Sequence, residues 1–263
     1  MLTLILAAVA QVATASEVPA GRPEAAAQTP AQIYEQCVDL ATGDPAQGEA
    51  FAEKWRVAGG AFLARQCLGI AYANQARWVP AASQFETAAN QAETAHDERA
   101  ARYWAQAGNA WLAAGQAASA RAALNAALAA GTLQGLELGE AQFDRARALV
   151  GLNDLAAARV DMDLALRFAE KDPLVWLASA ALARRMGNLA AARHDAAKAY
   201  DLAADDPSVF LEIGNIAAAS GDDAGARSAW NDVVRVAPKS AAATQARTAL
   251  QQFDPPEKPA ADR

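Results

Sequence analysis

Three segments in the second half of the chain repeat one another at a constant interval. Asn153, Gly187 and Gly221 occupy equivalent places in these segments. The stretches "DPLVWLASA", from Asp172, and "DPSVFLEIG", from Asp206, keep the same interval. A fixed interval of about 34 residues is typical of arrays in which each unit packs only on its neighbours. The chain is therefore expected to form an elongated repeat structure.

Each unit carries two helical patterns separated by a break. Pro173 and Pro207 suit the first turn of a helix, where a missing N–H costs little, and the aspartates before them suit the cap. Gly187 or Gly221 then ends the helix, and a second amphipathic helix follows. This pattern predicts an all-α chain of helix–turn–helix units.

Small residues recur where these helices would carry larger side chains, namely at Gly69, Ala81, Gly108, Ala120, Gly214 and Ala226. Small side chains let neighbouring helices approach until aromatic residues fill the remaining gaps. Replacing one of them with a large residue is expected to cost about 1–3 kcal/mol by overpacking. These positions are predicted helix contact points.

The repeat resembles the tetratricopeptide repeat family, whose unit is about 34 residues long. The unit from Ala101, for example, has Trp104, Gly108, Trp111, Gly115, Ala120, Leu124 and Ala127 at the family's positions. Units from Phe62, Gly139, Pro173 and Pro207 also match, that from Gly139 more weakly. The resemblance implies a right-handed superhelical α–α solenoid with a C-terminal capping helix, Ser240 to Phe253.

The expected organisation has four parts. Residues 1–15 are a signal peptide, 16–30 a disordered linker, 31–253 a repeat domain of about six helix pairs plus the cap, and 254–263 a disordered tail. The interval lengthens by roughly one helical turn between Ala76 and Gly115, and again between Gly115 and Asn153. The extra residues are expected in loops or longer second helices.

The N-terminus suggests export. The apolar run Leu2 to Val12 is too short to span a bilayer, and a small-x-small site ends at Ala15. A signal peptide cleaved after Ala15 is predicted, although no Lys or Arg precedes the run; the alternative is a frayed apolar helix or a misplaced start codon. No later segment has the character of a membrane span, so the mature chain is expected in the periplasm or otherwise secreted.

Two cysteines, Cys37 and Cys67, suit an exported protein with one disulfide. They would lie on adjacent first helices, close enough to be bridged. The alternative is a pair of buried, inert thiols.

Charge and chemistry exclude several functions. The formal net charge is −7, from 30 acidic and 23 Lys and Arg residues, and no basic run exists, which argues against nucleic acid. His96 and His194 are far apart, and no phosphate loop, nucleophile elbow or metal-ligand cluster is present. The chain is predicted to be no enzyme and to need no cofactor or metal.

The resemblance places a set of side chains in a concave groove lined by the first helices. The set is Gln66, Ile70, Asn74, Arg102, Asn109, Leu112, Phe143, Arg147, Leu177, Arg184, Arg185, Leu211 and Asn215. Arg147, Arg184 and Arg185 would hold an acidic peptide or a C-terminal carboxylate, because arginine binds carboxylates bidentately. Alternatively, these arginines form a solvated face.

Two functions follow as hypotheses. The first is an exported, periplasmic adaptor or scaffold that binds a protein or extended peptide in the groove, with no identity assigned to the partner. The second is a structural envelope protein that forms oligomers by end-to-end stacking of repeats. A third, a hydrolase with an unrecognised site, would depend on His96 or His194.

Overall fold

The computed structural model describes residues 28–253, which form thirteen α-helices and no strand. Twelve helices follow one another as six pairs, and a thirteenth completes the chain. Their bounds are α1 Pro30–Gly43, α2 Pro45–Val57, α3 Ala61–Asn74, α4 Trp78–Thr94, α5 Ala100–Ala113, α6 Ala117–Ala129, α7 Gly135–Gly151, α8 Leu155–Phe168, α9 Pro173–Arg185, α10 Leu189–Leu202, α11 Pro207–Ala219, α12 Asp223–Val236 and α13 Ala241–Phe253. The predicted signal peptide and tail, and residues 16–27 of the predicted linker, lie outside the described residues.

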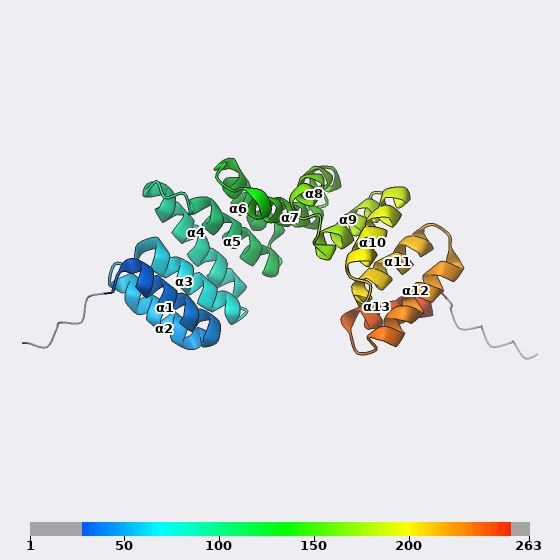
Figure 1. Ribbon diagram of the computed structural model, residues 1–263, viewed down its shortest axis with the longest axis horizontal. Coiled ribbons are helices and arrows are strands. Elements are labelled where there is room, and N and C mark those ends of the chain that lie inside the picture. Colours follow the sequence, from blue (N-terminus) through cyan, green and yellow to red (C-terminus); the bar gives the residue numbers. More distant parts are fainter. Residues whose placement is uncertain (1–27, 254–263) are drawn as a thin grey trace, which may run out of the picture.

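The pairs stack side by side into an open arch (Figure 1). The first pair and α13 lie at the two ends of the arch, and α6, α7 and α8 lie at its crown. Along the crown the first helices, α5 and α7, lie nearer the hollow of the arch, and the second helices, α6 and α8, lie nearer its outer surface. This arrangement confirms the all-α helical-repeat superhelix predicted from the constant interval in the sequence.

Local sequence explains where the helices begin. Asp172 and Asp206 accept hydrogen bonds from the main-chain N–H groups of Leu174 and Ser208, at 2.8 and 2.7 Å. The prolines after them occupy the first helical turn, as predicted. The first helix begins at Pro30, where Thr29 forms a reciprocal capping box with Gln32.

The turn inside each later pair has one residue in the left-handed region. Its φ is 56° at Ala76, 72° at Gly115, 61° at Asn153, 76° at Gly187 and 77° at Gly221. These residues are the ones aligned by the repeat. Glycine adopts this conformation at no steric cost and asparagine tolerates it, so four of the five residue types follow from the backbone; Ala76 does not.

The two longer intervals are explained by two longer helices. Helices α4 and α7 have 17 residues each, whereas the other helices have 13 or 14. Helix α4 is a second helix, as expected, but α7 is a first helix and follows the loop at residues 130–134. Most of the extra residues therefore lengthen α4 and α7, and the loops at 95–99 and 130–134 have one residue more than the loops at 169–172 and 203–206.

The predicted contact points are close approaches between the helices of a pair. A Cβ added to Gly69 would lie 2.5 Å from the Phe85 ring, and one added to Gly108 would lie 2.4 Å from Leu124 Cγ. Ala81, Ala120 and Ala226 are fully buried on the second helices. The small residues thus allow the helices to pack at the distance that the repeat requires.

The tryptophans are less buried than a pure core role predicts. Only Trp230 is buried, at 3% exposure. Trp104 and Trp111 are half-buried, and their indole N–H groups donate to the Glu93 and Glu86 carboxylates of α4, at 2.7 and 2.8 Å. Each ring therefore packs one side on the core and directs its polar edge outward.

The last helix covers the end of the array. Ala242, Ala243 and Ala246 of α13 are buried against Trp230 and Val233 of α12. These residues form the apolar face that a seventh pair would otherwise cover. Helix α13 therefore has the capping role predicted for it.

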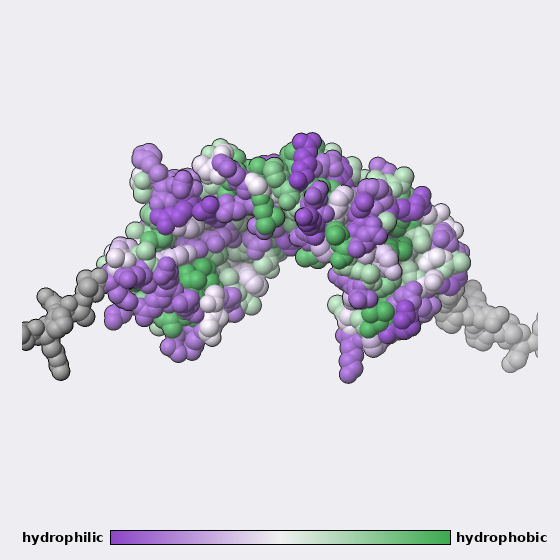
Figure 2. Space-filling model, viewed as in Figure 1, coloured by the Kyte–Doolittle hydropathy of each residue, from purple (hydrophilic) through white to green (hydrophobic). Residues whose placement is uncertain are grey.

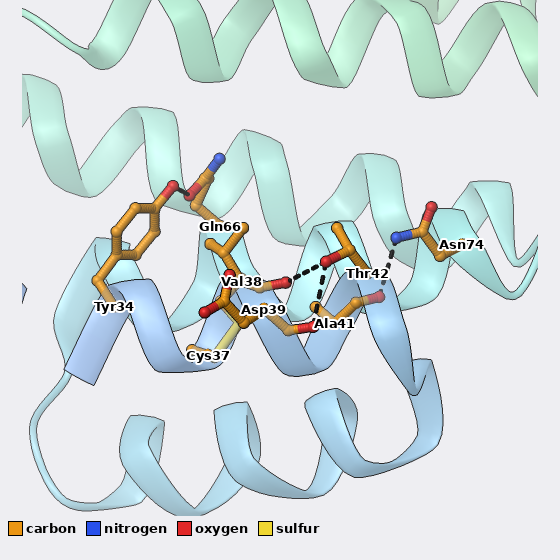
Figure 3. The surroundings of a disulfide bond; sticks show 9 residues. Tyr34, Cys37, Val38, Asp39, Ala41, Thr42, Gln66 and Asn74 are labelled. Carbon is orange, nitrogen blue, oxygen red and sulfur yellow. Dashed lines mark hydrogen bonds between the residues drawn. A yellow bond between two sulfur atoms is a disulfide. The ribbon is translucent and has the colours of Figure 1, made fainter. Parts of the chain in front are cut away.

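A disulfide joins Cys37 of α1 to Cys67 of α3, with the two Cα atoms 6.2 Å apart (Figure 3). Both cysteines are fully buried. At one end of α1 the Tyr34 hydroxyl donates to the Gln66 side chain, and at the other the Asn74 amide donates to the Ala41 carbonyl at 2.9 Å. Helix α1 is thus tied to α3 by one covalent bond and two polar contacts.

Candidate functional site

The inner surface of the arch contains two hollows separated by α7. We call them the N-terminal hollow, of about 420 Å³, between α3, α4, α5 and α7, and the C-terminal hollow, of about 540 Å³, between α7, α9, α11 and α13. Figure 2 shows the recess beneath the arch, with hydrophilic residues dominating the visible face and hydrophobic ones scattered among them. Both volumes are in the range of ligand-binding sites, about 300–1,000 Å³.

The N-terminal hollow combines apolar walls with carboxylates. Ile70, Trp78, Phe85 and Leu133 supply the apolar surface. Helix α7 contributes Glu137, Glu140 and Asp144, and α5 contributes Arg102 and Asn109. The 17-residue length of α7 matters here, because its first two turns carry Glu137 and Glu140 to the mouth of the hollow.

Two of these carboxylates have partners within the hollow. Arg102 pairs with Glu137 at 2.8 Å, and the Asn109 amide donates to Asp144 at 2.9 Å. Glu140 has no hydrogen bond or ion pair within residues 28–253. Its pKa is raised, first because the carboxylate loses hydration and then because Asp144 and Glu137 repel its charge.

The C-terminal hollow has the opposite balance. Phe143, Leu174, Leu177 and Leu211 line it with apolar surface, and Arg147 and Arg184 supply positive charge. The Arg184 guanidinium forms two hydrogen bonds with Glu212, at 2.6 and 3.1 Å. Glu212 is 7% exposed, so this pair is largely shielded from water.

The predicted arginine cluster is only partly free to bind a ligand. Arg147 pairs with Asp144 at 2.8 Å and lies over the Phe143 ring, 5.7 Å from its centre, with 46% of its side chain exposed. Arg185 is exposed and has no ion pair among the residues that the structure describes; it lies with Arg147 in a smaller neighbouring hollow. Arg147 and Arg185 are therefore the accessible cations, whereas Arg184 also supports the packing of α9 on α11.

The structure sorts the predicted groove residues into four places. Asn74, Arg102 and Asn109 line the N-terminal hollow; Phe143, Arg147, Arg184, Leu211 and Asn215 line the C-terminal hollow; Arg185 lies beside the latter; and Gln66 is buried. The placement of Gln66 differs from the expectation. At 5% exposure, its amide is used by Tyr34 and Gln106 and is not open to a ligand.

The acidic residues of the groove are absent from the set predicted from the sequence. Glu140 occupies the same repeat position as Arg102 and Ser208, so the rule that placed Arg102 in the groove also applies to it. Glu212 was missed because its role depends on Arg184, which lies 28 residues earlier on another first helix. The repeat position of Glu140 could be read from the sequence, whereas the pairing of Glu212 with Arg184 could not.

The histidines do not form a catalytic arrangement. His194 Nδ1 lies 2.9 Å from one Asp195 oxygen, and the Ser179 hydroxyl donates to the other at 2.5 Å. The aspartate stands between histidine and serine, so the imidazole does not receive the hydroxyl proton as a general base would. His96 occupies a turn, with a φ of 54°.

Within residues 28–253, no group of three His, Cys, Asp or Glu side chains is placed to hold a metal ion. No helix in this part of the chain combines the length and apolar character needed to cross a bilayer.

Comparisons with known proteins identify the fold. No protein-family model and no curated protein sequence matches the chain. Solved structures do match. PilW, described as a widely conserved type IV pilus biogenesis factor, has a TM-score of 0.69 and 18% identity over 83% of this chain and 99% of its own. PilF of Pseudomonas aeruginosa has a TM-score of 0.65 and 16% identity, over 84% and 99%.

YrrB, described as a TPR protein with an unusual peptide-binding site, has a TM-score of 0.55 and 17% identity, over 70% of this chain and 91% of its own. The stacked pairs and the inner groove define a helical repeat protein. More particularly, the fold is that of the tetratricopeptide repeat, as the resemblance implied.

Proposed function

We propose that the protein is an exported interaction scaffold that binds an extended segment of another protein along its inner groove. The observation that carries this proposal is the C-terminal hollow, where leucines and Phe143 adjoin the accessible guanidinium groups of Arg147 and Arg185. Apolar surface with a few placed polar groups is the usual character of a binding site. The likeness to YrrB, which has a peptide-binding site, supports the same interpretation.

Export to the envelope is part of the proposal. The disulfide between Cys37 and Cys67 supports it, because such bonds persist in oxidising compartments. The apolar run and small-residue site near the N-terminus agree with it. N-terminal sequencing of the mature protein tests this part: cleavage after Ala15 is expected, and an intact Met1 in envelope fractions would contradict it.

Site-specific photocrosslinking in the native envelope tests the binding role. A crosslinking residue at Leu177 or Leu211, within the C-terminal hollow, is expected to capture one discrete partner. The same residue at Leu202, which is 45% exposed on α10, is the matched control and should capture none. The adduct should weaken in an Arg147→Glu/Arg185→Glu background. Equal labelling at all three positions would contradict the proposal.

A further inference from the structure

The sign of the charge reverses across α7. On one side, three carboxylates of α7 line the hollow together with one guanidinium, that of Arg102; Asp144, one of the three, also pairs with Arg147. On the other side, Arg147 and Arg184 face the single carboxylate of Glu212, and Arg185 lies close by. The groove therefore has an acidic half and a basic half within one continuous inner surface.

The N-terminal hollow also offers apolar surface beside its charge. Trp78 and Phe85 line it from α4, and Ile70 lines it from α3. Long basic side chains have an apolar stem and a charged head, so they match such a combination. An aromatic face adds attraction for a cation, most strongly when the ring is tryptophan.

Charge complementarity selects the occupant. Glu140 is the one carboxylate of the N-terminal hollow that has no hydrogen bond or ion pair among the described residues, and it is exposed. Loss of hydration, followed by repulsion from Asp144 and Glu137, raises its pKa. A bound ammonium or guanidinium group would neutralise this carboxylate. An acidic or purely apolar side chain would leave it uncompensated and further desolvated.

We propose that the N-terminal hollow binds a lysine or arginine side chain of the partner segment, while the C-terminal hollow binds an acidic side chain or C-terminal carboxylate of the same segment. This inference rests on the proposed function and adds the chemistry of the ligand. Glu140 and Arg147 are seven residues apart on α7, an axial rise of about 10 Å. A segment in the polyproline II conformation rises about 9 Å over three residues and places its first and fourth side chains on the same face, so a Lys-x-x-Glu pattern is expected.

Fluorescence anisotropy with a designed probe tests the inference. The probe is the fluorescein-labelled peptide amide Gly-Ser-Leu-Lys-Leu-Ala-Glu-Leu-Gly, compared with one peptide in which Lys is replaced by Gln and another in which Glu is replaced by Gln. Loss of the lysine should raise the Kd for the full chain at least about fivefold. Glu140→Gln should abolish this preference, whereas Asp201→Asn, an exposed change on α10, should keep it.

The outcomes separate this inference from the proposed function. Equal Kd values for the lysine and glutamine peptides, or the same preference in Glu140→Gln, would overturn the inference. In that case, if peptides with the glutamate still bind more tightly than the peptide without it, and this preference requires Arg147 and Arg185, the proposed function stands without the inference. If no peptide binds below about 1 mM, both proposals fall. Deletion of residues 254–263 should leave the Kd unchanged; a large gain in affinity would assign the hollow to the chain's own C-terminal segment and overturn the inference.

Discussion

The indole of Trp230 packs directly on Gly214: a Cβ added to the glycine would lie 2.5 Å from the indole Cδ1 atom. The two residues are 16 positions apart, one on each helix of the sixth pair. Gly69 with Phe85 and Gly108 with Leu124 keep the same separation and the same close approach. This relationship is the packing unit of the repeat.

Substitution at Gly214 tests that unit. Gly214→Leu is expected to destabilise the protein by about 1–3 kcal/mol or more, because the indole cannot move without disturbing α13. Ala219→Leu, an exposed position at the end of α11, is the control and should have little effect. Thermal melts of both variants provide the measurement, and equal melting temperatures would mean that Gly214 is not a contact point.

A buried ion pair in the fourth helix pair is the second test. Arg145 forms two hydrogen bonds of 2.7 Å with Asp161, which is 3% exposed. Arg145→Ala should cost about 3–5 kcal/mol, since it leaves a buried carboxylate without its partner. Urea unfolding midpoints measure this loss.

Another unit of the repeat indicates which residues can replace this ion pair. Ile213 and Ala229 occupy the places of Arg145 and Asp161 two units later. The double change Arg145→Ile/Asp161→Ala is therefore expected to recover most of the stability, because it replaces the pair with apolar residues used at the same register. A double variant as unstable as Arg145→Ala would show that the pair is needed for another reason.

Reduction of the disulfide should destabilise the first two pairs. Cys37 and Cys67 are 30 residues apart, and the chain-entropy model gives a stabilisation of about 3–4 kcal/mol for a loop of this size. Reductant is expected to lower the urea midpoint of the native chain but not that of a Cys37→Ala/Cys67→Ala variant. Peptide mapping without reductant, with both cysteines alkylated, would contradict the bond itself.

The turn between α4 and α5 predicts a pH dependence of stability. Hydrogen bonds from the Arg99 side chain are the main cause that lowers the pKa of Asp97 from 3.8 to about 2. A lowered pKa in the folded state stabilises the fold above the ordinary value, and this stabilisation is lost as the pH falls from about 4 to about 2. The difference in melting temperature between the native chain and Asp97→Asn should therefore shrink over that range. A difference in melting temperature that does not change with pH would show that packing, and not the charge of Asp97, causes it.

Helix α13 predicts the assembly state. Truncation after Pro238 should expose Trp230 and Val233, lower the stability and cause concentration-dependent association in light scattering. Truncation after Phe253 is the matched control, because it leaves α13 in place. The full chain is expected to remain a monomer at every concentration; oligomers that grow with concentration would favour the structural, self-assembling alternative.

Much of the fold followed from local patterns. The caps at Asp172 and Asp206 and the turns at Gly187 and Gly221 depend on residues within a few positions of one another, so a linear pattern contains the necessary information. The extra turns of α4 and α7 were only partly predicted. The longer repeat intervals could be read from the sequence. Whether the added residues extend a helix or a loop depends on which side chains pack against the next helix.

The groove was predicted with less success for a related reason. The repeat rule identified which positions face inward: ten of the thirteen predicted residues line the N-terminal or the C-terminal hollow, and Arg185 lies in the smaller hollow beside them. Gln66 is buried, and Leu112 lines none of these hollows. The rule did not identify the partners of those residues. Gln66 is occupied by Tyr34 and Gln106, and Arg184 by Glu212, each from a different first helix.

The order of amino acids alone specified paired helices, their spacing and the small residues between them, because helix periodicity, capping and close packing act within a single repeat unit. Only the stacked molecule settled how Arg102 pairs with Glu137 and Arg184 with Glu212, since these contacts join residues of different units. The acidic and basic halves of the groove, with the unpartnered Glu140 in the acidic half, are brought together by the stacking of several pairs. Long-range packing, which no single repeat encodes, determines the chemistry of the inner surface.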